Sequence, residues 1–152
     1  MLASLTANAT PVSDRWLDAI QKIETGGEAA PDNAVGDGGK ARGRFQFHRA
    51  AWTDCSKIRK EMGLPTYPYS KATDKAIATD YARTWLTALR ERLAGEIGRP
   101  ARADEVWLAF NLGFSGFKKH HFQTHLVTDD ARYNKAVQIY NEVYAAKFPA
   151  RK

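Results

Sequence analysis

Apolar residues recur every three or four positions along most of the chain, which is the spacing of one face of an α-helix. The pattern predicts helices over about residues 12–25, 49–62, 73–94, 106–113 and 133–148. Between the first two helices, residues 26–43 contain six glycines and one proline, a composition that predicts irregular structure. Residues 44–47 alternate in polarity and predict an edge strand or an extended segment. We therefore expect a mainly α domain with a small loop or β-hairpin lip.

The first predicted helix has signals at both of its ends. Ser13 or Thr10 can cap its N-terminus by accepting a hydrogen bond from a backbone amide. At the other end Thr25 is followed by Gly26 and Gly27. Glycine readily adopts the left-handed conformation that ends many helices, so we expect a left-handed glycine at this point.

The length of 152 residues is that of one ordinary domain. We expect a flexible N-terminus over residues 1–11, one domain over 12–148 and a tail over 149–152. Residues 7–9, Ala-Asn-Ala, have the small-x-small form of a signal cleavage site. They are either the stub of a trimmed signal or a loose polar terminus, and we expect no intact signal peptide. No apolar run approaches the roughly 18 residues of a membrane span, so no transmembrane anchor is expected.

The formal net charge of +6 is unevenly distributed. Residues 1–38 contain six acidic and two basic side chains, which sum to −4, so the remainder carries +10. This distribution does not fit a uniform basic coat for nucleic acid, and no nucleic-acid partner is expected, but a basic C-terminal half suits an anionic polymer. The single cysteine, Cys55, excludes an intramolecular disulfide and is predicted to be a small buried hydrophobe.

Two carboxyl groups stand out along the N-terminal third. Glu24 lies at the C-terminal end of the first predicted helix, where the helix dipole and partial burial both favour the protonated form that a general acid needs. Asp37 follows thirteen residues later, between glycines that let a loop approach another group closely. Taken singly, Glu24 could be an exposed glutamate at a frayed helix end and Asp37 a turn former. As a pair facing each other across a cleft, they could cleave a glycosidic bond, one by protonating the leaving oxygen and the other by activating water or stabilising the cationic transition state.

Three short motifs in this order resemble the lysozyme-like superfamily, with goose-type lysozymes and soluble lytic transglycosylases as the nearest families. The motifs are Glu24 with Asn33-Ala34-Val35-Gly36-Asp37, then Gly43-Arg44-Phe45-Gln46-Phe47, then Ala109-Phe110-Asn111-Leu112-Gly113. The steps from Glu24 to Asp37 and from Asp37 to Gln46 match the goose-type spacing. The resemblance covers about residues 12–148 and implies a lysozyme-like catalytic domain.

The resemblance implies a role for each matching residue. Glu24 matches the catalytic acid, and Asp37 matches a carboxylate that handles the attacking water. The matching substrate-contacting positions are Gln46, Phe110 and Asn111, with Gly43 letting the backbone approach the sugar. His48 stands where goose-type enzymes often have a second aspartate, and we expect it to bind substrate. Other departures are Thr25 for serine, Arg44-Phe45 for Leu-Met, and Phe110 for tyrosine.

The implied activity is cleavage of the β-1,4 bond between N-acetylmuramic acid and N-acetylglucosamine in peptidoglycan, with no cofactor and no metal. Asp37 favours hydrolysis with inversion. The alternatives are a lytic transglycosylase that forms 1,6-anhydro products, and a catalytically degenerate module that only binds glycan. We expect a monomer that acts in the periplasm or after secretion, or that a phage delivers to the cell wall.

Other conspicuous residues have competing interpretations. Tyr67 and Tyr69, in a proline-containing loop, are candidates for stacking on sugars or simply pack the loop. His121 and His125 are four positions apart, as zinc ligands can be, but lie in a basic stretch without an evident third ligand. The glycines of residues 36–41 lack the spacing and the hydroxyl residue of a phosphate-binding loop.

Overall fold

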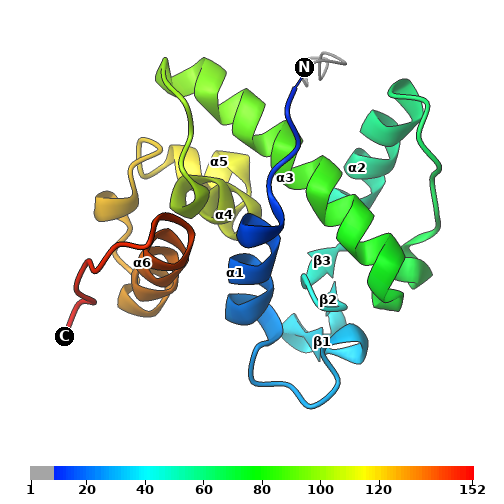
Figure 1. Cartoon of the computed structure of the whole chain (residues 1–152), viewed down its shortest axis with the longest axis horizontal. Helices are drawn as coiled ribbons and strands as arrows, with labels where there is room; N and C mark the ends of the chain where they lie inside the picture. Colours follow the sequence, from blue (N-terminus) through cyan, green and yellow to red (C-terminus); the bar gives the residue numbers. More distant parts are fainter. Residues whose placement is uncertain (1–8) are drawn as a thin grey trace.

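The computed structural model describes residues 9–152, which form six α-helices and one three-stranded antiparallel sheet (Figure 1). The helices are α1 (Asp14–Thr25), α2 (Arg49–Glu61), α3 (Lys75–Ile97), α4 (Ala103–Leu112), α5 (Phe114–Lys118) and α6 (Asp130–Tyr144). The strands β1 (Val35–Gly36), β2 (Ala41–Arg42) and β3 (Phe47–His48) are adjacent in that order. The predicted fold class, mainly α with a small hairpin lip, is confirmed.

Helix α3 extends along both halves of the molecule (Figure 1). On one side, α2 packs against α3 and β3, and the sheet lies beyond the C-terminal end of α1. On the other side, α6 packs against both α1 and α4, while α4 contacts α3 and α5. Large buried side chains, among them Trp52, Tyr81 and Trp107, fill the interior. Trp52 and Tyr81 stack with their ring centroids 3.7 Å apart, which joins α2 to α3.

Helix α1 begins as its sequence predicts but ends differently. The Ser13 side chain accepts a hydrogen bond from the Trp16 amide and caps the helix. Gly26 is right-handed, with φ −63° and ψ −22°, so the expected left-handed glycine at this end is wrong. The chain instead continues its right-handed turn, with the Gly26 amide bonded to the Lys22 carbonyl, before it enters the lip.

The lip is more ordered than its glycine content predicts. Residues 26–43 contain β1 and β2, with short 3₁₀ turns at Pro31–Asn33 and Asp37–Gly39. The strand expected over residues 44–47 is wrong, because residues 43–46 form a turn and only Phe47 belongs to a strand. Gly43 and Gln46 both have positive φ, and the Gln46 amide bonds to the Gly43 carbonyl. This geometry reverses the chain between β2 and β3.

Several helix ends differ from the periodicity prediction. Helix α3 passes through Gly95 and ends at Gly98, whose left-handed conformation caps it. Helix α4 begins earlier than expected because the Glu105 side chain caps its first turn by accepting from the Arg102 amide. The expected fifth helix, α6, ends at Tyr144, where Ala145 is left-handed. The short helix α5 was not predicted, since five residues are too few for a clear period.

The expected domain boundaries can be compared with the contacts at both ends. Residues 1–8 lie outside the described part of the chain. They include most of the expected flexible N-terminus and two of the three residues of the Ala-Asn-Ala motif. Val12 is buried, and its amide donates to the Thr87 hydroxyl. The expected tail is attached to α6, because the Arg151 amide donates to the Asn134 side chain and its guanidinium lies over Tyr133. No helix within residues 9–152 has both the length and the apolarity to cross a membrane.

Candidate active site

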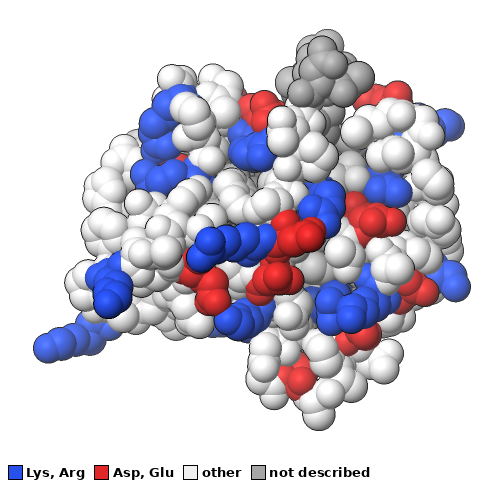
Figure 2. Space-filling model, in the orientation of Figure 1, with Lys and Arg blue, Asp and Glu red and all other residues white. Residues whose placement is uncertain are grey.

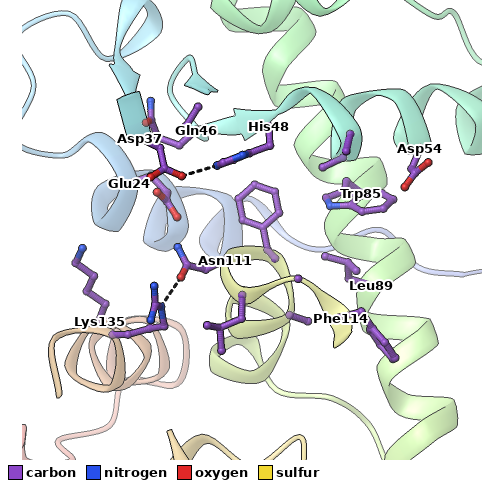
Figure 3. Close-up of a pocket in the computed structure, with 18 of the residues that line it drawn as sticks. Glu24, Asp37, Gln46, His48, Asp54, Trp85, Leu89, Asn111, Phe114 and Lys135 are labelled. Carbon is purple, nitrogen blue, oxygen red and sulfur yellow. Dashed lines mark hydrogen bonds and ion pairs between the residues drawn. The ribbon is translucent and has the colours of Figure 1, made fainter. Parts of the chain in front are cut away.

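A cavity of about 730 Å³ lies where the lip and α2 face the ends of α1, α4, α5 and α6 (Figure 3). Six of the eight predicted site residues line it: Glu24, Asp37, Gln46, His48, Phe110 and Asn111. They come from five separate elements and turns, so the fold brings together residues up to 87 positions apart, from Glu24 to Asn111. A volume of this size is typical of a small-molecule or substrate site.

Glu24 projects from the last turn of α1 into the cavity, and its side chain is mostly buried. Its Oε1 accepts a hydrogen bond of 2.8 Å from the indole Nε1 of Trp107, a fully buried residue of α4. Burial raises the pKa of the Glu24 carboxyl above its ordinary value, while the Trp107 hydrogen bond and the positive charge of Lys135 oppose the rise. The net effect favours a carboxylic acid, the state in which Glu24 can donate a proton.

Asp37 reaches the same cavity from the lip (Figure 3). Its backbone is left-handed, with φ 54°, and its side chain is 68% exposed. The carboxylate Oδ2 lies 3.0 Å from Nε2 of His48, which ends β3. The histidine that stands in place of the expected second aspartate therefore contacts the first one.

Gln46 and Thr25 attach the lip to the rest of the site. The Gln46 amide nitrogen donates to the carbonyls of Gly43 (2.9 Å) and Ala34 (3.3 Å), so this side chain closes the turn that it belongs to. The Thr25 hydroxyl, next to Glu24, donates to the Arg44 carbonyl at 2.8 Å. The substitution of threonine for serine thus keeps a hydroxyl with a positioning role, which is to hold the turn against the end of α1.

Phe110 and Asn111 occupy the C-terminal turn of α4. Phe110 is half-buried and packs edge-on against Phe47 of β3, with centroids 5.5 Å apart. Asn111 is exposed, and its Oδ1 accepts a hydrogen bond of 2.6 Å from Nε of Arg132 on α6. The phenylalanine in place of tyrosine therefore serves packing of the cavity floor, while Asn111 links α4 to the α6 side of the cavity.

Two predicted site residues do not line the cavity. Gly43 is left-handed, with φ 78°, and a Cβ at this position would lie 1.8 Å from the Ala72 carbonyl oxygen. Its backbone therefore approaches the 3₁₀ turn Tyr69–Thr73 of this chain, which accounts for the glycine. The expected approach of Gly43 to a sugar stays a prediction.

Tyr67 also lies away from the cavity, against α2 and α3. Its carbonyl accepts from the Trp52 indole and its amide donates to the Tyr81 hydroxyl, both at 2.9 Å. The neighbouring Tyr69 ring is buried, with its hydroxyl bonded to the Phe47 carbonyl. The structure therefore supports loop packing for the Tyr69 side chain. The Tyr67 side chain is exposed, and its stacking on a sugar stays a prediction.

Sequence reasoning missed several residues that surround the site: Trp85, Arg92, Phe114, Arg132 and Lys135 line the cavity, and Trp107 holds Glu24. Trp107 precedes Phe110 and Asn111 by three and four positions, so helical spacing alone places it on the same face of α4. No sequence pattern indicated that Arg132 and Lys135 of α6 would lie at the cavity. Only the packing of α6 against α1 brings them to Glu24.

The other chemical candidates have no supporting constellation. Within residues 9–152, no three His, Cys, Asp or Glu side chains are grouped as metal ligands, so nothing supports a zinc site at His121 and His125. Cys55 is buried, and burial raises the pKa of its thiol to about 12, which is the behaviour of a packing residue. Acidic and basic side chains alternate on the face drawn in Figure 2, which is therefore no continuous basic surface.

No protein-family model, no curated protein and no solved structure matches this chain. A function must therefore be inferred from the three sequence motifs and from the geometry of the cavity that they line.

Proposed function

We propose that this protein is a peptidoglycan glycosidase that cleaves the β-1,4 bond between N-acetylmuramic acid and N-acetylglucosamine. The observation that carries the proposal is the environment of Glu24, a mostly buried carboxyl with a raised pKa, bonded to Trp107 and opening onto a cavity that also contains Asp37. Two carboxyl groups in one such cavity, one mostly buried with a raised pKa and one exposed, match the needs of glycoside hydrolysis.

Each group has one step in the proposed reaction. Glu24 donates its proton to the glycosidic oxygen as the bond to the anomeric carbon breaks. Asp37, held by His48, accepts a proton from the water that attacks that carbon. Gln46, Phe110 and Asn111 line the space for the sugars. The reaction consumes one water and leaves a reducing end, and solvent then returns the proton from Asp37 to Glu24.

The contact between Asp37 and His48 favours hydrolysis over internal attack. A lytic transglycosylase needs no group for water, because the sugar's own 6-hydroxyl displaces the leaving group. A carboxylate restrained at 3.0 Å by a histidine in the same cavity is suited to orienting water. We also propose that the protein is a monomer, and that it works outside the cytoplasm or is delivered to the cell wall by a phage.

The test is digestion of purified peptidoglycan with analysis of the products by mass spectrometry. We expect muropeptides with reducing ends, and a smaller reducing-end fraction from Asp37→Asn. Products lighter by one water would reassign the protein to the lytic transglycosylases. Binding to the wall with no released muropeptides would contradict any glycosidase and leave the degenerate glycan-binding module.

Trp107→Phe is expected to shift the alkaline limb of the pH–activity profile to higher pH. The Trp107 hydrogen bond stabilises the ionised carboxylate and so lowers the pKa of Glu24. Without it that pKa rises further, and the acid stays protonated to a higher pH. The measurement is kcat/KM against pH on soluble glycan. Trp16→Phe, which alters a tryptophan of α1 outside the cavity lining, is the matched control, and an unmoved limb in Trp107→Phe would contradict the role of this hydrogen bond.

A further inference from the structure

The cavity has charges of opposite sign on its two sides. Figure 3 shows Asp37 and His48 on one side and Lys135 on the other, with Glu24 between them. Arg132 lines the cavity next to Lys135, three positions before it on α6, so the two cations share one helix face. Two contacts of Glu142 hold α6 against α1: its side chain pairs with Lys22 and its carbonyl accepts from Arg15. The cations are thus fixed beside the catalytic acid.

Arg132 is positioned with unused donors. Its Nε donates to Asn111 at 2.6 Å and its Nη1 to the Asp129 carboxylate at 3.0 Å. A guanidinium has five N–H donors, and Nη2 of Arg132 makes no hydrogen bond with any described residue. The two existing contacts leave the side chain with a fixed orientation, and the free edge can take a carboxylate oxygen.

Lys135 has no carboxylate within ion-pair distance among residues 9–152. Its charge also acts against the chemistry, because a cation near Glu24 favours the ionised form and lowers the pKa that the acid needs. A lysine in this place costs the general acid some of its protonation.

We propose that Arg132 and Lys135 form a carboxylate-binding subsite beside Glu24, which selects glycan strands that carry an acidic group on the muramic sugar over neutral chitin. The proposal rests on the proposed glycosidase function. The acidic group has two chemical sources, the free lactyl carboxylate of a peptide-free strand and the carboxylates of the stem peptide. A polymer of N-acetylglucosamine alone offers neither.

Binding measurements in the Glu24→Gln background test this without cleavage of the ligand. The probes are a peptide-bearing muramyl tetrasaccharide, the same tetrasaccharide without peptide, and chitotetraose. We expect either or both acidic probes to bind at least about tenfold more tightly than chitotetraose at low salt, with the advantage falling as salt rises. A preference confined to one acidic probe identifies the lactyl group or the stem peptide as the partner.

Lys135→Gln should remove most of this advantage and leave the affinity for chitotetraose unchanged, and Lys135→Arg should restore it. Arg132→Gln provides a second variant, and Lys119→Gln removes the same charge from an exposed position outside the cavity lining. Equal affinity for acidic and neutral probes, or equal losses on both in Lys135→Gln, would overturn the subsite. Failure of the glycosidase function is a separate result, namely wild-type protein that leaves peptidoglycan uncut.

Discussion

Glu24→Gln is expected to lower the rate of peptidoglycan cleavage by about 10²–10⁴-fold, the usual contribution of a positioned general acid. Glutamine keeps the shape of the side chain and an oxygen that can accept the 2.8 Å hydrogen bond from Trp107. It has no proton to give to the leaving oxygen. The measurement is release of soluble muropeptides from purified walls at the pH optimum of the wild type, with circular dichroism to verify the fold.

The same substitution should raise stability at neutral pH. Because the pKa of Glu24 is raised in the folded protein, this carboxyl favours folding at low pH, and that contribution is lost as the pH rises through the folded-state value. Glutamine never ionises. We therefore expect Glu24→Gln to unfold at a higher temperature than the wild type at pH 7 and at the same temperature near about pH 3, below the usual pKa of a glutamate.

Glu28→Gln is the control for both measurements, since Glu28 is an exposed glutamate four residues further along. It should change neither cleavage nor the pH dependence of stability. Full cleavage by Glu24→Gln would remove this residue from the chemistry. Loss of cleavage together with a lower melting temperature at pH 7 would instead indicate a structural role for the carboxylate.

Local patterns in the sequence predicted the parts of the molecule that depend on neighbouring residues alone, namely the main helices and the cap of α1. The helical period located α1, α2 and α3, because each buries a continuous apolar stripe, and Ser13 capped α1 as its hydroxyl predicts. The order and spacing of the motifs also predicted that Glu24 and Asp37 would reach one place. In the structure both side chains line one cavity, because the turns and strands of the lip fold the intervening chain back against the end of α1.

Features that depend on tertiary packing could not be predicted from these local patterns. The strand expected over residues 44–47 was misplaced because Gln46 adopts a positive φ, which is uncommon for a residue with a side chain and is stabilised here by its own amide contacts. Lys135 looks like any solvated lysine of an amphipathic helix. Its position beside Glu24 follows from how α6 packs on α1, which no local spacing encodes.

Gly43 shows most clearly what local sequence cannot predict, and Gly43→Ala is expected to lower the free energy of unfolding by about 2–5 kcal/mol. A left-handed backbone costs an alanine about 1–2 kcal/mol. The new Cβ would in addition lie 1.8 Å from the Ala72 carbonyl oxygen, so the turn must move away from the segment that it packs on. Overpacking of this kind typically adds about 1–3 kcal/mol. For a chain of this size the sum corresponds to a fall in melting temperature of about 10 °C.

Gly38→Ala is the matched control for this prediction, because Gly38 has a similar φ of 64° but no atom within 4 Å of the point that a Cβ would occupy. It carries the backbone cost alone, about 1–2 kcal/mol, and should lower the melting temperature by only about 2–8 °C. Denaturant or thermal unfolding of both variants gives the comparison directly. If Gly43 served close approach of a sugar, Gly43→Ala would be as stable as Gly38→Ala and defective only in binding glycan. The packing of the turn against Ala72 predicts instead that Gly43→Ala is less stable than Gly38→Ala. Its activity should fall as a consequence, because the lip that carries Asp37 and Gln46 no longer keeps its position near Glu24.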